Sequence, residues 1–282
     1  MKLALPKGRM MDGVLTLLAD AGVRVSLGER GYRPRLSLEG FDVKLLKPQN
    51  AVEMMHQGTR DLGFAGADWV AELDGDLVEL LDTGLDPVRV VAAAPSALLV
   101  EGELPRQPLR VASEYERLTT RWIRERNLEA SFLRSYGATE VFPPEDADCI
   151  VDNTATGATL EANRLTIIDE LMRSSTRLYA SPAALADPVK RQRIEDLALV
   201  LGGVLQARRR VMVEVNVAPD RLDALVEILP CLRQPTVARL SGDAGFAVKA
   251  AVPRDALPGL IPRIRQSGGS DIVVTELAQL LA

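Results

Sequence analysis

The segment from Asp148 to Asn163 carries residue types that suit phosphate binding. Its first five residues are small and apolar, bounded by acids, and predict a buried strand that ends at Asp152. Residues 159–163 have the composition of a helix, and a loop of small residues precedes them. Such a turn aims N–H groups and hydroxyls at one point, as a phosphate requires. Asp152 could hold a sugar diol, although a plain strand-to-helix connection would have the same composition. The loop consists of Thr154, Ala155, Thr156, Gly157, Ala158 and Thr159.

A basic turn follows the first predicted strand. Lys2–Pro6 reads as that strand, and Lys7-Gly8-Arg9 then leads into a helix. The turn places two cations at the carboxyl edge of a sheet, where the ligands of open α/β sheets bind. Solvated surface charge would explain Lys7 and Arg9 equally well.

Another turn with candidate residues lies in the segment from Asp61 to Trp69, which reads as a strand, a glycine turn and a helix start. Gly66 permits a close approach of the backbone to a ligand. Asp68 could cap the helix or contact an amine or hydroxyl of a substrate, and these two roles are compatible.

Residues 152–160 resemble the phosphoribosyl-pyrophosphate loop of phosphoribosyltransferases, an acid followed by a Thr-Gly-x-Thr-Leu turn. Two unrelated folds carry such a loop, and the common single-domain type usually has two adjacent acids before it, whereas Asn153 follows Asp152 here. The longer string Gly157-Ala-Thr-Leu-Glu-Ala-Asn163 is similar to ATP phosphoribosyltransferase, the first enzyme of histidine biosynthesis. The Leu-Pro-Lys-Gly-Arg start and the segment 61–68 resemble the same family.

This resemblance implies transfer of a phosphoribosyl group from phosphoribosyl pyrophosphate to N1 of ATP, with release of pyrophosphate and with Mg²⁺ bound mainly through the substrate phosphates. The loop would hold the 5′-phosphate and Asp152 the ribose hydroxyls. Lys7, Arg9 and Lys47 would face phosphates, because family members place Arg or Lys where Lys47 stands. The sequence departs from the family pattern at Asn50, Asn153 and Thr154.

Composition limits the other function classes. The 282 residues are 47% hydrophobic and 26% charged, which is enough globular material for two or three domains. A net charge of −5 argues against a nucleic-acid surface, and no apolar run approaches the length of a membrane span. Cys149 and Cys231 lack metal-ligand spacing, so we expect a reduced, cytoplasmic protein without a protein-built metal site. The only histidine, His56, reads as structural.

Strands and helices alternate along the chain, which predicts α/β layers that would position these residues. A helix over residues 115–127 precedes the phosphate loop, and Pro188 opens a long helix that runs to about Arg208. Beyond the strands already named, the predicted ones before that helix include 87–94, 96–100, 109–113, 130–134, 165–172 and 177–180.

The last part of the chain reads as a separate module. Residues 210–217 alternate valines with other residues, as a half-buried strand does. The elements that follow are a helix over 220–229, strands over 236–240 and 245–252, a helix over 254–267 and a strand over 271–275. The order β-α-β-β-α-β indicates a ferredoxin-like module.

The family resemblance implies how these elements group into domains. It predicts a bilobal core similar to periplasmic binding proteins, with a first lobe over 1–90 and 178–204 and a second lobe over 91–177 that carries the phosphate loop. Residues 205–282 would form the C-terminal regulatory domain of the long form, which binds histidine as a feedback inhibitor. Matching positions of the family's histidine pocket are Asn216, Leu232, Thr236, Ala251 and Asp271.

Two alternatives remain open at the level of sequence. One is a phosphoribosyltransferase for another acceptor, which the loop chemistry allows. The other is a catalytically silent binding or regulatory subunit on the same scaffold, against which the presence of Lys7, Asp152 and Thr159 argues. By resemblance to the family, the chain is expected to form a homo-oligomer, a dimer or a hexamer.

Overall fold

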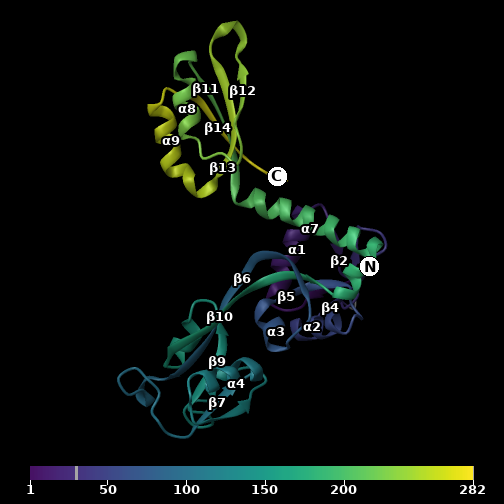
Figure 1. Cartoon of the computed structure of the whole chain (residues 1–282), viewed down its shortest axis with the longest axis vertical. Coiled ribbons are helices and arrows are strands. Elements are labelled where there is room, and N and C mark those ends of the chain that lie inside the picture. Colours follow the sequence, from purple (N-terminus) through teal and green to yellow (C-terminus); the bar gives the residue numbers. More distant parts are fainter. Residues whose placement is uncertain (29–30, 282) are drawn as a thin grey trace. The chain divides into compact units, whose positions relative to one another are not determined.

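The computed structural model describes residues 1–28 and 31–281. The chain forms two compact units, one made of residues 1–19 and 23–198 and the other of residues 20–22 and 199–282 (Figure 1). Within the described residues, no helix is both long and apolar enough to cross a membrane.

The first unit is built on one mixed sheet. Over the described residues this sheet has eight strands in the order β4-β1-β5-β10-β6-β9-β7-β8. Strands β4, β1 and β5 are mutually parallel, and so are β9, β7 and β8. The antiparallel ribbon of β6 and β10 joins these two groups. The bounds are β1 (Lys2–Pro6), β4 (Asp42–Leu46), β5 (Leu62–Gly66), β6 (Val78–Pro95), β7 (Leu109–Ser113), β8 (Ala130–Arg134), β9 (Cys149–Thr154) and β10 (Leu165–Ala180).

Each parallel group carries its own helices, so the predicted bilobal α/β core is confirmed. The first lobe consists of β4, β1 and β5 with α1, α2 and α3, and the second lobe of β9, β7 and β8 with α4 and α5. A short hairpin of β2 (Val25–Ser26) and β3 (Arg35–Leu36) lies in the segment that precedes β4. The helices are α1 (Met10–Asp20), α2 (Pro48–His56), α3 (Ala67–Glu72), α4 (Glu116–Glu125), α5 (Ala158–Ala162), α6 (Pro182–Ala186) and α7 (Pro188–Arg208).

Strand pairing brings the carboxyl ends of the two parallel groups to the middle of the β6–β10 ribbon. Gly66, the last residue of β5, pairs with Thr176 of β10, and Thr154, the last residue of β9, pairs with Arg89 of β6. Arg89 itself pairs with Arg173 of β10, three residues before Thr176. Loops that leave both groups therefore face the same part of the ribbon, where ligands of α/β sheets bind.

Two predictions about this ribbon are wrong. Residues 165–172 and 177–180 form one strand, β10, because the polar residues between them are paired and largely buried rather than part of a turn. Residues 96–100 do not form a strand. Pro95, the last residue of β6, pairs with Leu165, the first residue of β10, so no partner strand continues beyond it, and Ser96–Leu98 form a 3₁₀ turn instead.

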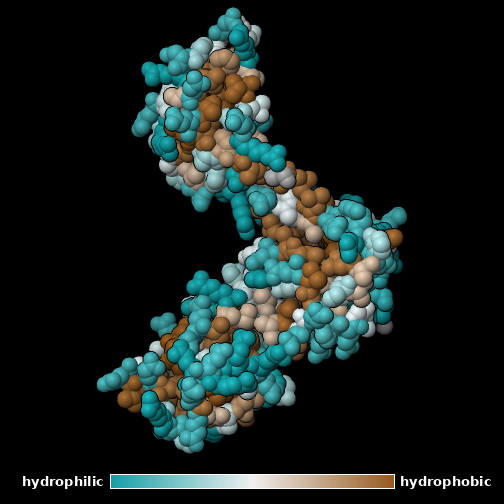
Figure 2. Space-filling model, in the orientation of Figure 1, coloured by the Kyte–Doolittle hydropathy of each residue, from teal (hydrophilic) through white to brown (hydrophobic). Residues whose placement is uncertain are grey.

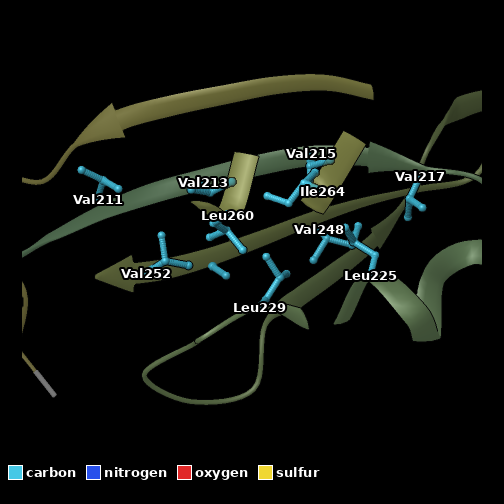
Figure 3. Packing of buried hydrophobic residues seen from close by; sticks show 11 residues of the cluster. Val211, Val213, Val215, Val217, Leu225, Leu229, Val248, Val252, Leu260 and Ile264 are labelled. Carbon is cyan, nitrogen blue, oxygen red and sulfur yellow. The ribbon is translucent and has the colours of Figure 1, made fainter. Parts of the chain in front are cut away.

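The second unit has the predicted ferredoxin-like fold. Over its described residues a four-stranded antiparallel sheet has the order β12-β13-β11-β14. The alternating valines of β11 turn toward α8 and α9, where Leu225, Leu260 and Ile264 complete a buried core (Figure 3). Burial of these apolar side chains is the main favourable term for this small module. The bounds are β11 (Arg210–Val217), α8 (Leu222–Ile228), β12 (Thr236–Arg239), β13 (Phe246–Pro253), α9 (Leu257–Gln266) and β14 (Ser270–Glu276).

Candidate functional site

A cleft of about 260 Å³ lies in the first unit at the middle of the β6–β10 ribbon. Both lobes and the ribbon contribute side chains to it, as the strand pairing requires. Its lining includes Lys7, Arg9, Met10, Pro48, Gly66, Asp68, Trp69, Asp86, Val88, Asn153, Ser174, Ser175 and Thr176.

The basic residues of the first lobe gather at one edge of the cleft because of strand pairing. Pro6 pairs with Leu46, so Lys7 and Lys47 leave adjacent strands side by side, and the N–H of Lys7 donates to the carbonyl of Leu46 at 2.8 Å. Lys7 and Lys47 are exposed, and the ammonium group of Lys7 lies 4.6 Å from the ring centre of Tyr32. Lys7 lines the cleft, whereas Lys47 does not, although its neighbour Pro48 does.

Gly66 and Asp68 form the turn between β5 and α3. A Cβ atom at Gly66 would overlap the carboxylate of Asp68, which explains why glycine stands there. Helix α3 begins after Gly66 without a side-chain cap, so the capping role predicted for Asp68 is wrong. The Asp68 carboxylate instead accepts hydrogen bonds from the hydroxyls of Ser174, at 2.6 Å, and Tyr115, at 2.7 Å.

Three consecutive hydroxyl residues of β10 form the floor of the cleft, and sequence reasoning missed them. Ser174 donates to Asp68, Ser175 donates to Asp82 at 2.6 Å, and Thr176 donates to Asp86 at 3.0 Å. All three are buried, although they lie in the middle of a strand. The three consecutive hydroxyl residues are the signal in the sequence that would have indicated them.

The predicted phosphate loop has the expected strand, loop and helix order. Gly157 takes a φ of +89°, which favours glycine, and precedes α5. The hydroxyl of Thr154 accepts from the N–H of Gly157 at 2.9 Å, and that of Thr156 accepts from the N–H of Ala158 at 3.3 Å. Ala155, Thr156, Ala158 and Thr159 are exposed, so their loop surface is open to a ligand.

Strand β9 runs on to Thr154, so the predicted end at Asp152 is wrong because Asn153 and Thr154 also pair with β6. Asp152 lies near the carboxyl end of this strand, and its environment disfavours ionisation. Burial, together with the charges of Glu140 and Glu114, raises the pKa of Asp152 to about 6, and the hydrogen bond from the N–H of Asn153 opposes that shift. Asp152 and residues 154–159 are not among the lining residues of the cleft, but Asn153 is. The structure therefore brings Lys7, Arg9, Gly66 and Asp68 together in the cleft, and the phosphate loop begins at the residue after Asn153.

In the second unit a hollow of about 300 Å³ gathers three of the residues that resemble the histidine pocket. Leu232, Thr236 and Ala251 line it, and the N–H of Leu232 donates to the carbonyl of Ala251 at 3.3 Å. Asn216 and Asp271 do not line this hollow. They lie together elsewhere on the unit, where the amide of Asn216 donates to the carboxylate of Asp271 at 3.1 Å.

The C-terminal tail forms one wall of the same hollow. Leu280 and Leu281 line it, and the N–H of Leu280 donates to the carbonyl of Gly203 in α7 at 2.9 Å. A Cβ atom at Gly203 would lie 2.7 Å from Cδ2 of Leu281. The tail is thus packed so closely against the helix that a side chain at position 203 would require Leu281 to move.

Comparisons with known proteins cover the whole chain. The family model described as HisG, ATP phosphoribosyltransferase, matches residues 47–203, and the model described as the HisG C-terminal domain matches residues 207–279. ATP phosphoribosyltransferases from Chlorobaculum parvum and Pelotomaculum thermopropionicum are each 34% identical to this chain. The matches span 100% of this chain and 97% and 99% of the two relatives.

A solved structure, the ATP phosphoribosyl transferase (HisG:HisZ) complex from Thermotoga maritima, contains a chain that is 26% identical and superposes with a TM-score of 0.64. The match covers 72% of this chain and 96% of that one. The fold, the family models and the full-length relatives thus agree on the family. The chain belongs to the ATP phosphoribosyltransferase family.

Proposed function

We propose that phosphoribosyl pyrophosphate binds between the phosphate loop and the cleft, with its 5′-phosphate on residues 154–159 and its ribose hydroxyls on Asp152. The observation that supports this placement is the position of Asp152 at the carboxyl end of β9, one residue before cleft-lining Asn153. An ionised carboxylate accepts two hydrogen bonds and so matches a ribose diol. The glycine turn and the threonine hydroxyls supply donors for a phosphate.

The cations of the first lobe are proposed to bind the pyrophosphate and the phosphates of ATP. Lys7 and Arg9 line the cleft, and Lys47 is adjacent to Lys7 through the pairing of Pro6 with Leu46. Opposite charges in a partly dehydrated cleft attract more strongly than in bulk water. Mg²⁺ is proposed to enter with the pyrophosphate, held mainly by phosphate oxygens, because the Asp68 and Asp86 carboxylates at the cleft already accept protein hydroxyls.

The reaction is the transfer of the phosphoribosyl group from phosphoribosyl pyrophosphate to N1 of ATP, the first step of histidine biosynthesis. A bond forms between N1 and the anomeric carbon, and the bond to pyrophosphate breaks. Adenine N1 already carries a lone pair, so the work proposed for the residues of this cleft is orientation of the two substrates and stabilisation of the charge on the departing pyrophosphate. Lys7, Arg9 and Lys47 are the groups assigned to that charge.

We also propose that histidine inhibits the enzyme by binding the second unit at the hollow lined by Leu232, Thr236 and Ala251. Support comes from the match of residues 207–279 to the family's C-terminal domain and from the clustering of these three residues. The hollow also offers Lys249 and Gln234, whose polar groups suit a zwitterionic amino acid.

Self-association of the chain, as a dimer or a hexamer, is a further part of the proposal. Edge strand β14 exposes Val273 by 53% and Val274 by 41%, and edge strand β12 exposes Val237 by 41%. Edge strands with exposed valines favour pairing with another chain. The face of the second unit seen in Figure 2 likewise carries hydrophobic surface bordered by hydrophilic residues. Light scattering on the purified chain should give a mass of two or six protomers, and a monomer at working concentration would contradict this part.

Replacement of Thr159 by valine tests the proposed phosphate site. Thr159→Val is nearly isosteric but removes a hydroxyl from the exposed face of the loop. Because a hydrogen bond to a charged group contributes about 1.5–3 kcal/mol, the affinity for phosphoribosyl pyrophosphate should fall about tenfold to a hundredfold. Calorimetric titration measures this affinity, with Thr120→Val, an exposed threonine of α4, as the matched control. Equal affinities in the two variants would mean that the loop does not hold the phosphate.

A further inference from the structure

Tyr115 connects the two lobes from a completely buried position at the start of α4. Its hydroxyl donates to Asp68 of the first lobe at 2.7 Å. The same hydroxyl oxygen accepts from the side-chain amide of Asn153, in the second lobe, at 2.9 Å. A single tyrosine oxygen therefore joins the turn after β5 to the residue that precedes the phosphate loop.

Neighbouring contacts hold the Tyr115 ring in place independently of its hydroxyl. The ring stacks on Trp69 of α3, with 4.7 Å between ring centres. The carboxylate of Glu72, also in α3, accepts from the N–H groups of Arg117 and Leu118 at the start of α4, both at 3.0 Å. A phenylalanine at position 115 should thus occupy the same place.

The hydrogen bonds that link Asp68, Tyr115 and Asn153 have a fixed direction, because the tyrosine hydroxyl has only one proton to donate. Burial and then the negative charge of Asp68 raise the pKa of Tyr115 far above its ordinary value, so the hydroxyl keeps its one proton. That proton goes to Asp68, whose other carboxylate oxygen accepts from Ser174. Only a lone pair of the tyrosine oxygen is left toward residue 153, which must therefore be a donor.

The amide nitrogen of Asn153 meets this requirement and a second one. It lies 2.9 Å from the Tyr115 hydroxyl and 3.5 Å from Oδ1 of Asp152, and both of these oxygens are acceptors. The N–H of Asn153 also donates to Oδ1 of Asp152, at 2.7 Å. Asn153 thus connects the buried tyrosine to the carboxylate proposed to hold the ribose.

We propose that Tyr115 is a positioning residue for the transfer reaction, which commits position 153 to a hydrogen-bond donor and through it orients Asp152 toward the substrate ribose. This inference rests on the proposed role of Asp152. It assigns a function to a tyrosine that touches no substrate, and it explains why an amide rather than a second acid follows Asp152. A carboxylate at position 153 would face the tyrosine oxygen with no proton between them, because the one hydroxyl proton is already donated to Asp68. It would also place a second negative charge beside Asp152.

A double-mutant cycle tests the proposal. In the parent chain Asn153→Asp should raise the KM for phosphoribosyl pyrophosphate about tenfold or more, because the new carboxylate faces an oxygen that has no proton to give. In a Tyr115→Phe background the same substitution should raise KM by a clearly smaller factor, because the tyrosine oxygen is gone and only the added charge beside Asp152 remains. The KM for ATP should change by less than the KM for phosphoribosyl pyrophosphate in every variant.

Three controls keep the outcome interpretable. Tyr136→Phe, at a tyrosine that is 91% exposed, measures the effect of losing a tyrosine hydroxyl elsewhere. The cycle is repeated with Asn153→Ala, which removes the donor without adding charge and should show coupling of the same sign even if Asn153→Asp does not fold. Asp152→Asn in the same assay separates the two proposals, because an unchanged KM in that variant would overturn the ribose role of Asp152.

Equal effects of both position-153 substitutions in the parent chain and in the Tyr115→Phe background would overturn the positioning role. That result would count against Tyr115 even if Asp152→Asn weakens phosphoribosyl pyrophosphate as proposed. The position-153 substitutions could also change the unfolding temperature by different amounts in the two backgrounds while changing the KM for phosphoribosyl pyrophosphate equally. That result would make the contact structural only and would also overturn the proposal.

Discussion

At the residue scale, the carboxyl group of Asp152 combines poor solvation with a proposed role that requires charge. Burial is the largest cause of its raised pKa, and Glu140 and Glu114 add to the shift. A carboxylate that must accept two ribose hydroxyls works only when ionised, so its pKa of about 6 lies close enough to neutral pH to limit activity in mild acid.

This leads to a prediction for the pH dependence of activity. The value of kcat/KM for phosphoribosyl pyrophosphate should fall as the pH is lowered through about 6, because Asp152 becomes protonated there. Initial rates at low phosphoribosyl pyrophosphate measure the ratio. In Asp152→Asn, kcat/KM should be low at every pH and should not fall further as the pH is lowered through about 6. Asp146→Asn, at an exposed neighbouring acid, should keep the pH profile of the parent. A parent profile that is flat from pH 5 to 8 would contradict the role given to Asp152.

The same pKa predicts an effect of opposite sign on stability. Because the folded-state pKa is raised from 3.8, this carboxyl favours folding below its ordinary pKa, and that contribution is lost as the pH rises through about 6. Asp152→Asn should therefore increase the free energy of unfolding by about 1–3 kcal/mol at pH 8, with a discount for partial solvent contact, and by much less at pH 4. Urea unfolding at the two pH values measures the difference. Destabilisation at pH 8 would show that the carboxylate is well solvated or paired.

Residue chemistry could be predicted from sequence where a motif is contiguous. The basic turn at Lys7 and Arg9 and the small-residue loop both stand out in the printed chain. Tyr115 and Ser174 do not, because their significance depends on contacts with Asp68 across 47 and 106 residues. A buried tyrosine at a helix start looks like ordinary core until its hydroxyl partners are known.

At the element scale, strand register decides what the cleft contains. The sequence predicted most strands correctly, including all four of the second unit, and the regular valine alternation of β11 was the clearest signal among them. It divided β10 at Arg173–Thr176, since polar residues in a strand normally mark a turn. Ser175 and Thr176 donate to Asp82 and Asp86 of β6, which lie 93 and 90 residues away, and a local pattern does not reveal such partners.

The packing of the C-terminal tail on α7 gives a prediction at this scale. Gly203→Ala should push Leu281 out of the hollow that carries Thr236, and so raise the histidine concentration needed for half inhibition about threefold to thirtyfold. Alanine is also the better helix former by about 1 kcal/mol, so the variant should not unfold earlier.

Gly259→Ala is the matched control for this variant, because it changes a helical glycine of the same unit that has open space around it. Histidine inhibition curves at fixed substrate concentrations compare the two variants with the parent. Unchanged histidine sensitivity in Gly203→Ala would mean that the C-terminal tail does not line the proposed histidine site.

At the scale of the whole molecule, the residues proposed to bind substrate and those proposed to bind histidine lie in different compact units. The cleft and the phosphate loop belong to the first unit, and the hollow with Thr236 belongs to the second. The discontinuous catalytic core was expected from family resemblance, because no local pattern shows that β10 returns between β5 and β6. The ferredoxin-like module, in contrast, was predicted from the order of strands and helices in the sequence alone.

Because the two proposed sites belong to different units, substitutions in one should change histidine inhibition without changing the activity measured in its absence. Thr236→Ala should raise the histidine concentration needed for half inhibition about threefold to a hundredfold, since one polar contact is lost, while activity without histidine stays near that of the parent. Thr275→Ala, at an exposed threonine on the opposite edge strand of the same sheet, is the matched control. Direct competition of histidine with phosphoribosyl pyrophosphate, together with parent-like inhibition of Thr236→Ala, would contradict a separate effector site.

The most direct test of the central claim is pyrophosphate release by the purified full-length chain with a panel of acceptors. Release should require ATP, phosphoribosyl pyrophosphate and Mg²⁺ together, and should stop when any one is omitted or when a chelator removes the metal. Orotate and free purine bases offered in place of ATP should give no turnover. Equal turnover with one of those acceptors, or none with ATP under conditions where phosphoribosyl pyrophosphate is bound, would contradict this account.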